Sequence, residues 1–234
     1  MTSIKRFYTE NPLKSWQQVL GPKMHYHHGS YSDDDIFDQT IRNLYPYIPN
    51  NSSILDMGCG WGGPATLLEN EKHCHVHGVT NSLQQQQHND QITFLSDVHD
   101  FIPQQDYDIA IFIESLTHFT NPSQVLANIR PYTNKIIIKD HIYYQDFYNP
   151  VWQMHFRPID SFKHLIQQHY NIQIIEEDKQ IDVYNSYLFW YNNISKLNPN
   201  QITNQIKTLY QFSKKIIQRG PEIDKIKVVT IVAT

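Results

Sequence analysis

The stretch from Ser53 to Pro64 reads S-I-L-D-M-G-C-G-W-G-G-P, and it decides which fold the whole chain is expected to adopt. Ile54 and Leu55 are apolar residues of the kind found in buried strands, and four glycines follow within residues 58–63. Ala65 to Leu68 then return to a pattern that suits a helix. A strand, a glycine-rich turn and a helix in this order are typical of a nucleotide-binding loop. Because so many glycines would destabilise an ordinary turn, they indicate a backbone that approaches a ligand closely.

Two features distinguish this loop from a site for NAD or a similar dinucleotide. Asp56 stands just before the first glycine, where its carboxylate would repel a pyrophosphate. About 20 residues further on, a dinucleotide site needs an acid for the ribose, but Gly78 to Ser82 reads G-V-T-N-S. A carboxylate beside the glycines suits a cationic ligand instead.

The segment D-M-G-C-G-W-G-G resembles motif I of the class I S-adenosylmethionine-dependent methyltransferases, which have a Rossmann-like fold. The resemblance implies an α/β fold with a seven-stranded, mostly parallel sheet, helices on both faces and an antiparallel last strand. It also implies that the loop lies against the methionine part of S-adenosylmethionine. The loop residues expected to contact this cofactor are Asp56, Gly58, Cys59 and Gly60.

A second segment, Thr80 to Gln85, reads T-N-S-L-Q-Q and resembles the T-L-S-x-x-Q segment of the cyclopropane-synthase-like branch, which includes small-amine N-methyltransferases. In that branch the hydroxyls and the glutamine replace the ribose carboxylate of other relatives. The resemblance therefore explains the missing acid, and the other glutamines are expected on a solvated helix face. The expected cofactor contacts in this segment are Thr80, Asn81, Ser82 and Gln85.

Gly21 to Ser32 reads G-P-K-M-H-Y-H-H-G-S-Y-S and resembles a loop of the same branch that closes over the cofactor. By this resemblance Tyr26 is expected at the cofactor, and Tyr31 of the same loop is a further candidate contact. His27 and His28 are candidate catalytic residues, because His is the natural base near neutral pH. The alternative is an exposed polar connector before a helix at 36–47, with Ser32 as its N-cap.

Further candidates follow the strands expected at 92–95, 107–113 and 135–139, because sites in open α/β sheets lie at the carboxyl ends of strands. Asp97 and Val98 resemble the residues that hold the adenine, although a solvated strand-end Asp is the competing interpretation. Glu114 and His118 form an E-x-x-x-H pattern that resembles the family's motif after strand four. Both residues, with His141 after strand five, are candidate bases; Glu114 is also a candidate cofactor contact. His118 could equally hydrogen-bond the cofactor loop.

The rest of the chain suggests one domain of 234 residues with four parts. We expect an N-terminal cap and lid at 1–50, a cofactor-binding half at 51–145, a substrate-covering region at 146–225 and the last strand at 226–234. The third part should contain an aromatic-rich helical insertion at 182–218. The alternative for that insertion is a helical pair that completes the core.

Composition excludes several other functions. The net charge is −4 and Lys and Arg are scattered, which argues against a nucleic-acid partner. The two cysteines provide no disulfide framework, and there is no signal peptide or apolar run of about 18 residues, so a cytoplasmic location is expected. The 13 histidines lack a recognised metal-binding spacing, since His73, His75 and His77 only alternate along a strand. No metal site is predicted.

The resemblance to the methyltransferases implies methyl transfer from S-adenosylmethionine to a small molecule, which we expect in natural-product or secondary metabolism. A monomer or homodimer is expected. The acceptor atom could be an amine, a hydroxyl or an activated carbon. Thr117 stands where cyclopropane synthases carry an acid, which disfavours lipid cyclopropanation. Two alternatives are a non-methylating enzyme that uses the same cofactor and a cofactor-free binding protein that has kept the fold.

Overall fold

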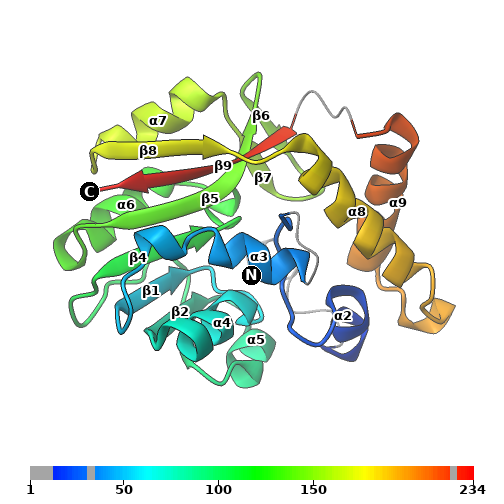
Figure 1. Ribbon diagram of the computed structural model, residues 1–234, viewed down its shortest axis with the longest axis horizontal. Helices are drawn as coiled ribbons and strands as arrows, with labels where there is room; N and C mark the ends of the chain where they lie inside the picture. The colour runs from blue at the N-terminus through cyan, green and yellow to red at the C-terminus, as the bar shows by residue number, and fades with distance from the viewer. Residues whose placement is uncertain (1–12, 31–34, 222–225) are drawn as a thin grey trace.

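A seven-stranded sheet forms the centre of the computed structural model, which describes residues 13–30, 35–221 and 226–234 (Figure 1). The strand order is β3-β2-β1-β4-β5-β9-β8. β9 runs antiparallel to both of its neighbours, and the other pairings are parallel. This confirms the predicted mostly parallel sheet with an antiparallel last strand. The strands are β1 (Ser53–Met57), β2 (His75–Thr80), β3 (Ile92–Leu95), β4 (Ile109–Ile113), β5 (Ile136–Tyr143), β8 (Ile172–Glu177) and β9 (Ile226–Ala233).

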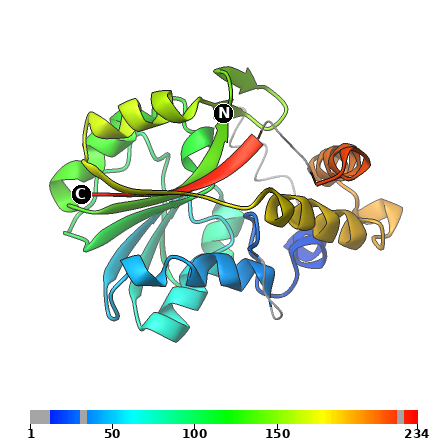
Figure 2. The ribbon, with the colours of Figure 1, turned by 45° about the horizontal axis from the view of Figure 1, so that its top comes forward.

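Helices cover both faces of this sheet, as predicted (Figure 2). In the described ranges, no helix combines the length and apolar character needed to cross a membrane. A separate hairpin of β6 (Phe147–Asn149) and β7 (Met154–Phe156) follows β5. The α-helices are α2 (Leu13–Leu20), α3 (Ile36–Arg42), α4 (Gly63–Lys72), α5 (Leu83–His88), α6 (Pro122–Ile129), α7 (Ile159–Gln167), α8 (Gln180–Ile194) and α9 (Asn204–Arg219). The 3₁₀ turns are η1 (Tyr45–Tyr47), η2 (Leu116–His118), η3 (Arg130–Tyr132) and η4 (Pro199–Gln201).

The central strands are buried on both faces, which explains their continuous apolar runs. Leu55 points to the face covered by α6 and α7, where it shares a core with Phe162. Its neighbour Ile54 points to the opposite face and packs in a core with Leu68 of α4, because successive strand residues alternate between faces.

A third core joins the N-terminal helix to the insertion before β9. Trp16 of α2, Trp190 of α8 and Leu209 of α9 are all buried in this cluster. The predicted helical region at 182–218 is therefore two helices with a break between them. Its buried aromatics form a core, as the alternative interpretation held, and a role in covering the substrate stays a prediction.

Several predicted boundaries differ from the structure. β5 continues to Tyr143, so His141 lies within the strand and pairs with Val228 of β9. The helix expected at 36–47 ends at Arg42 and is followed by the turn η1, because Pro46 has no N–H group to donate to the carbonyl of Arg42 and its ring would clash with that carbonyl in a continued helix. The N-cap prediction was wrong: Ser32 lies outside the described residues, and the carboxylate of Asp35 caps α3.

The cap gives a direct stability test. Asp35 accepts hydrogen bonds from the backbone N–H groups of Phe37 at 2.9 Å and Asp38 at 3.3 Å. Asp35→Ala should lower the free energy of unfolding by about 1 kcal/mol in urea titrations. Asp35→Asn should retain most of the stability, since Asn is an equally good cap. A larger loss from Ser32→Ala than from Asp35→Ala would contradict this assignment.

Candidate functional site

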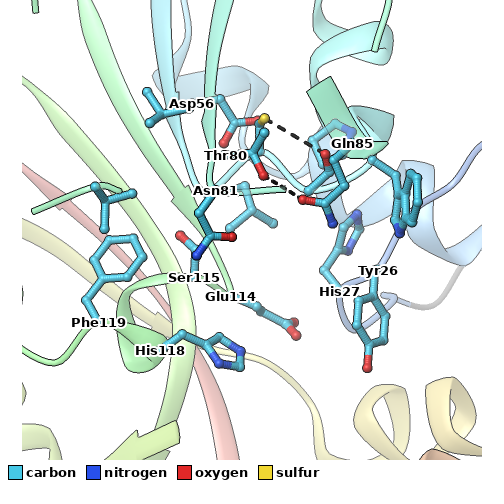
Figure 3. A pocket seen from close by; sticks show the side chains of 18 of the residues that line it. Tyr26, His27, Asp56, Thr80, Asn81, Gln85, Glu114, Ser115, His118 and Phe119 are labelled. Carbon is cyan, nitrogen blue, oxygen red and sulfur yellow. Dashed lines mark hydrogen bonds between the residues drawn. The ribbon is translucent and has the colours of Figure 1, made fainter. Parts of the chain in front are cut away.

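A cavity of about 400 Å³ lies at the carboxyl ends of β1, β2, β3 and β4. The strand order reverses between β1 and β4, the place where open α/β sheets bind their ligands. Figure 3 shows Asp56 and Thr80 at the top of this space, with His118 on the left and Tyr26 and His27 on the right. The predicted cofactor residues that line the cavity are Tyr26, Asp56, Gly58, Cys59, Gly60, Thr80, Asn81, Gln85, Asp97, Val98 and Glu114.

The remaining predicted residues divide into three groups. Two catalytic candidates, His27 and His118, also line the cavity. Ser82, His28 and His141 are not among the described residues that line it. Tyr31 lies outside the described part of the chain. The structure therefore brings most of the predicted site together, whereas the task of each residue stays a prediction.

The glycine-rich turn shapes one wall of the cavity. Gly58 and Gly60 both have left-handed backbones, with φ of 87° and 53°, which favour glycine. A Cβ atom on Gly58 would lie 2.7 Å from Cβ of Ser115, so the turn packs directly against the segment after β4. At Gly60 no heavy atom of the described residues, chain neighbours aside, would lie within 4 Å of such a Cβ. The Gly60 backbone is therefore open to the cavity.

Asp56 places an uncompensated carboxyl group in the same wall. The residue is 1% exposed, and its Oδ2 atom has no hydrogen-bond partner among the described residues. Burial raises the pKa of Asp56 to about 7. An unsatisfied buried carboxyl is costly, so this atom is suited to a ligand that brings a positive charge or an N–H group.

The T-N-S-L-Q-Q segment is only partly arranged as predicted. The Thr80 hydroxyl donates to Oε1 of Gln85 at 2.6 Å (Figure 3), which leaves the Gln85 amide nitrogen as the donor that a ligand can use. Ser82 is the N-cap of α5, where its hydroxyl accepts from the backbone N–H of Gln85 at 3.4 Å. Ser82 therefore stabilises the helix start and is not among the described residues that line the cavity. Its contact with the cofactor stays a prediction.

Asp97 is held by a residue that the sequence did not indicate. His99 donates from Nδ1 to Oδ1 of Asp97 at 2.7 Å and also lines the cavity. The backbone N–H of Asn121 donates to Nε2 of His99 at 3.1 Å, which assigns the ring proton to Nδ1. The Asp97 side chain is 42% exposed, so it is oriented by His99 while remaining in contact with solvent.

The histidine-rich loop is buried, unlike the exposed connector of the alternative interpretation. His25, His27 and His28 are between 1% and 3% exposed. The backbone N–H of Gly29 donates to the hydroxyl of Ser186 in α8 at 2.8 Å. His28 donates its backbone N–H to Oε1 of Glu114 at 2.6 Å. The loop is thus fixed to α8 and to the end of β4.

His27 is poorly placed to act as a base, although it was predicted as a catalytic candidate. Its Nδ1 atom lies 3.0 Å from the carbonyl oxygen of His28, and its Nε2 atom lies 3.0 Å from Nδ1 of His25. His25 in turn contacts Oδ1 of Asp38 at 2.9 Å. Both His27 nitrogens are occupied and burial lowers its pKa to about 3, so the catalytic role of His27 stays a prediction that this geometry does not favour.

Glu114 connects the cavity to two histidines behind it. Its carboxylate lies 2.9 Å from Nδ1 of His28 and 3.6 Å from Nε2 of His141. Burial acts to raise the pKa of Glu114, but His28 and His141 together outweigh burial and hold that pKa well below its usual range. Burial likewise acts to lower the pKa of His141, but Glu114 and Asp140 outweigh it and raise that pKa. The cluster therefore favours a charged carboxylate and a charged imidazole.

Other cavity residues were missed by the sequence analysis. Ser115 and Phe119 lie inside the E-S-L-T-H-F segment, and Trp61 lies inside motif I, so their positions in the motifs could have indicated them. Tyr148 belongs to the β6–β7 hairpin, and no local pattern marks it. Residues of this last kind reach the cavity through tertiary packing alone.

Comparison with known proteins finds relatives among N-methyltransferases and cyclopropane synthases. Over 129 residues the chain is 27% identical to (S)-tetrahydroprotoberberine N-methyltransferase of Eschscholzia californica, covering 48% of this chain and 37% of that protein. The chain therefore spans little more than a third of the length of this relative. Coclaurine N-methyltransferase, crystallised with N-methylheliamine and S-adenosylhomocysteine, has a TM-score of 0.79 at 15% identity, over 97% of this chain and 82% of that chain. A cyclopropane synthase of Mycobacterium tuberculosis has a TM-score of 0.81 at 12% identity, over 100% and 99% of the two chains.

A family model also matches the sequence directly. Residues 28–177 match the model described as a methyltransferase domain. The match begins in the histidine-rich loop and extends through both cavity walls to β8. The chain belongs to the methyltransferase-domain family, whose cofactor is S-adenosylmethionine.

Proposed function

We propose that the protein transfers the methyl group of S-adenosylmethionine to the nitrogen of a small amine. The observation that carries the proposal is the wall that combines the unsatisfied Oδ2 atom of Asp56 with the open backbone of Gly60. The cofactor is cationic and presents N–H donors, so it fits a buried carboxyl that lacks a partner among the described residues. Gln85 and Asp97 would then contact its nucleoside part.

An amine acceptor is supported by chemistry and by the comparisons. The aromatic residues Tyr26, Phe119 and Tyr148 line the cavity, and the faces of such rings attract cations. The nitrogen of a neutral amine gains positive charge as it is methylated. An aromatic lining would therefore stabilise the transition state more than the neutral acceptor. Both N-methyltransferases compared above act on nitrogen by name.

The protein has little covalent chemistry to perform in such a reaction. When bound, the cofactor supplies an electrophilic methyl group, and the rate depends mainly on positioning and on exclusion of water. Met24, Tyr26 and His27 of the buried loop line the cavity and would hold water away from the acceptor. His118 lines the cavity from the other side, and burial lowers its pKa. A neutral His118 can accept a proton from the amine, which must be unprotonated to attack.

Ligand binding and turnover test the proposal. Calorimetry should show saturable binding of S-adenosylhomocysteine and none of NAD, and mass spectrometry should show a methyl group added to secondary or tertiary amines. Gly60→Val should abolish cofactor binding, because its side chain fills the open space at Gly60. Gly220→Val is the matched control, since Gly220 also has a positive φ of 81° and open surroundings but ends α9 away from the cavity. Saturable NAD binding with none of S-adenosylhomocysteine would refute the proposal.

The glutamines of α5 test the nucleoside contact. Gln85 is buried beside Thr80, whereas Gln87 is exposed on the same helix. Gln85→Ala should weaken S-adenosylhomocysteine binding by about 1 kcal/mol or somewhat more, because a ligand group loses its partner. Gln87→Ala should leave the dissociation constant unchanged. Equal effects in calorimetry would show that the segment is not a cofactor contact.

Asp56 predicts a pH dependence with a defined sign. The pKa of Asp56 is about 7 in the folded chain, above the usual 3.8. The folded state therefore favours the protonated carboxyl over the carboxylate. The ligand-free protein should therefore lose stability as pH rises from about 4 to 7, and Asp56→Asn should lack this contribution. Cofactor affinity should rise over the approach to pH 7, as the carboxylate forms. The neighbouring Cys59 stays protonated, because burial raises its pKa further.

Thermal unfolding and calorimetry across this interval provide the measurement, with the wild-type curves compared with those of Asp56→Asn. If both proteins show the same slopes, Asp56 does not titrate in this range and the fit to a cationic ligand loses its support.

A further inference from the structure

We propose that His28, Glu114 and His141 bind a divalent transition-metal ion of the zinc type, at a site behind the cavity that shares Glu114 with the cavity wall. His28 comes from the loop before α3, Glu114 directly follows β4, and His141 lies within β5. Their donor atoms all lie within 4.8 Å of one another. Two imidazoles and one carboxylate form a donor set that zinc and similar ions prefer.

The donor atoms are close to the spacing that such an ion requires. Zinc ligands at about 2.0–2.2 Å in tetrahedral geometry lie about 3.4 Å apart. Here Oε2 of Glu114 lies 2.9 Å from Nδ1 of His28 and 3.6 Å from Nε2 of His141. The two distances bracket the expected value, so small ring movements would suffice to complete the geometry.

Neighbouring groups orient the ligands in the manner of metal sites. Asp140 contacts Nδ1 of His141 through Oδ1 at 3.3 Å, which turns Nε2 toward Glu114. Asp140 is itself fixed by the hydroxyl of Thr117 at 2.8 Å and the backbone N–H of Thr117 at 3.0 Å. A carboxylate that holds the far nitrogen of a ligating histidine is the usual support of a bound metal.

Glu114 is oriented in a similar way. Its Oε1 atom accepts the backbone N–H of His28 at 2.6 Å, and this bond leaves Oε2 to face both rings. The Glu114 backbone has a φ of 50°. Such a conformation is strained for a residue other than glycine, and strain of this kind accumulates at functional sites.

The cluster is shielded from solvent. The side chains of His28, Glu114 and His141 are 3%, 7% and 7% exposed. The rings of Tyr187 and Trp190 pack at 5.0 and 5.3 Å from the His28 ring. These apolar neighbours would strengthen the attraction between a bound ion and its ligands. Glu114 also lines the cavity.

The competing explanation is an ion-free latch, in which Glu114 only fastens the loop by hydrogen bonds. Equilibrium dialysis of chelator-treated protein against Zn²⁺, with metal analysis, distinguishes the two. Co²⁺ serves as a second probe, because its visible absorption reports nitrogen and oxygen ligands in four- or five-coordinate geometry. We expect one ion per chain and an absorption band that Zn²⁺ displaces.

Variants locate the ion. His141→Ala and Glu114→Gln should weaken Zn²⁺ binding at least tenfold and remove the Co²⁺ band. Asp140→Asn, which only orients His141, should weaken binding about 10- to 100-fold. His155→Ala is the matched control, because His155 also lies beside a carboxylate, at 2.6 Å from Asp146, but on the surface. This variant should bind Zn²⁺ like the wild type.

Circular dichroism and melting temperature establish that each variant is folded, and Glu114→Gln keeps the size of the side chain and an acceptor for the His28 N–H group. If Zn²⁺ binding is absent in the wild type, or equal in the wild type and a folded Glu114→Gln or Asp140→Asn protein, the cluster is a latch and the proposal is overturned.

Discussion

The contact between the turn after β1 and the segment after β4 is the constraint on which the cavity depends. The hydroxyl of Ser115 donates to the carbonyl of Met57 at 2.6 Å. Position 58 has no room for a side chain, because a Cβ atom there would lie 2.7 Å from Cβ of Ser115. The N–H groups of Gly58 and Cys59 both donate to the carbonyl of Val79 at the end of β2. One turn therefore ties three strand ends together. The wall with Asp56 and the wall with Glu114 keep a fixed separation as a result.

The cavity also depends on compensation of the buried charges that contact the histidine-rich loop. Glu114 is satisfied by His28, and Asp38 contacts His25 and forms an ion pair with Lys23. A buried charge that loses its partner costs several kcal/mol, on the order of 3–5. The unusual histidine content of the loop is explained by these pairings, since each ring contacts a carboxylate or another ring. Tyr26 of the same loop packs against Trp16 and Trp190 and lines the cavity.

The sequence was sufficient for features that depend on local patterns. Gly58 and Gly60 marked the turn, and the uninterrupted apolar run of β4 marked a strand buried on both faces. Contacts between distant segments were not visible, because no local pattern encodes that His28 meets Glu114, 86 residues further on. For the same reason the site residue His99 was missed. Ser82 was assigned to the ligand although its hydroxyl caps a helix, since a Ser before a helix serves either purpose equally well.

Glu114 shows how the fold and the site depend on one another. Its left-handed backbone costs about 1–2 kcal/mol relative to a relaxed residue, and glycine would adopt that conformation without strain. The chain nevertheless carries a glutamate there, whose carboxylate accepts the His28 N–H group and lies between two imidazoles. The interactions of this side chain must therefore exceed the backbone strain. Without them, the histidine-rich loop would lose its attachment to the end of β4. Nothing would then offset the backbone strain at Glu114.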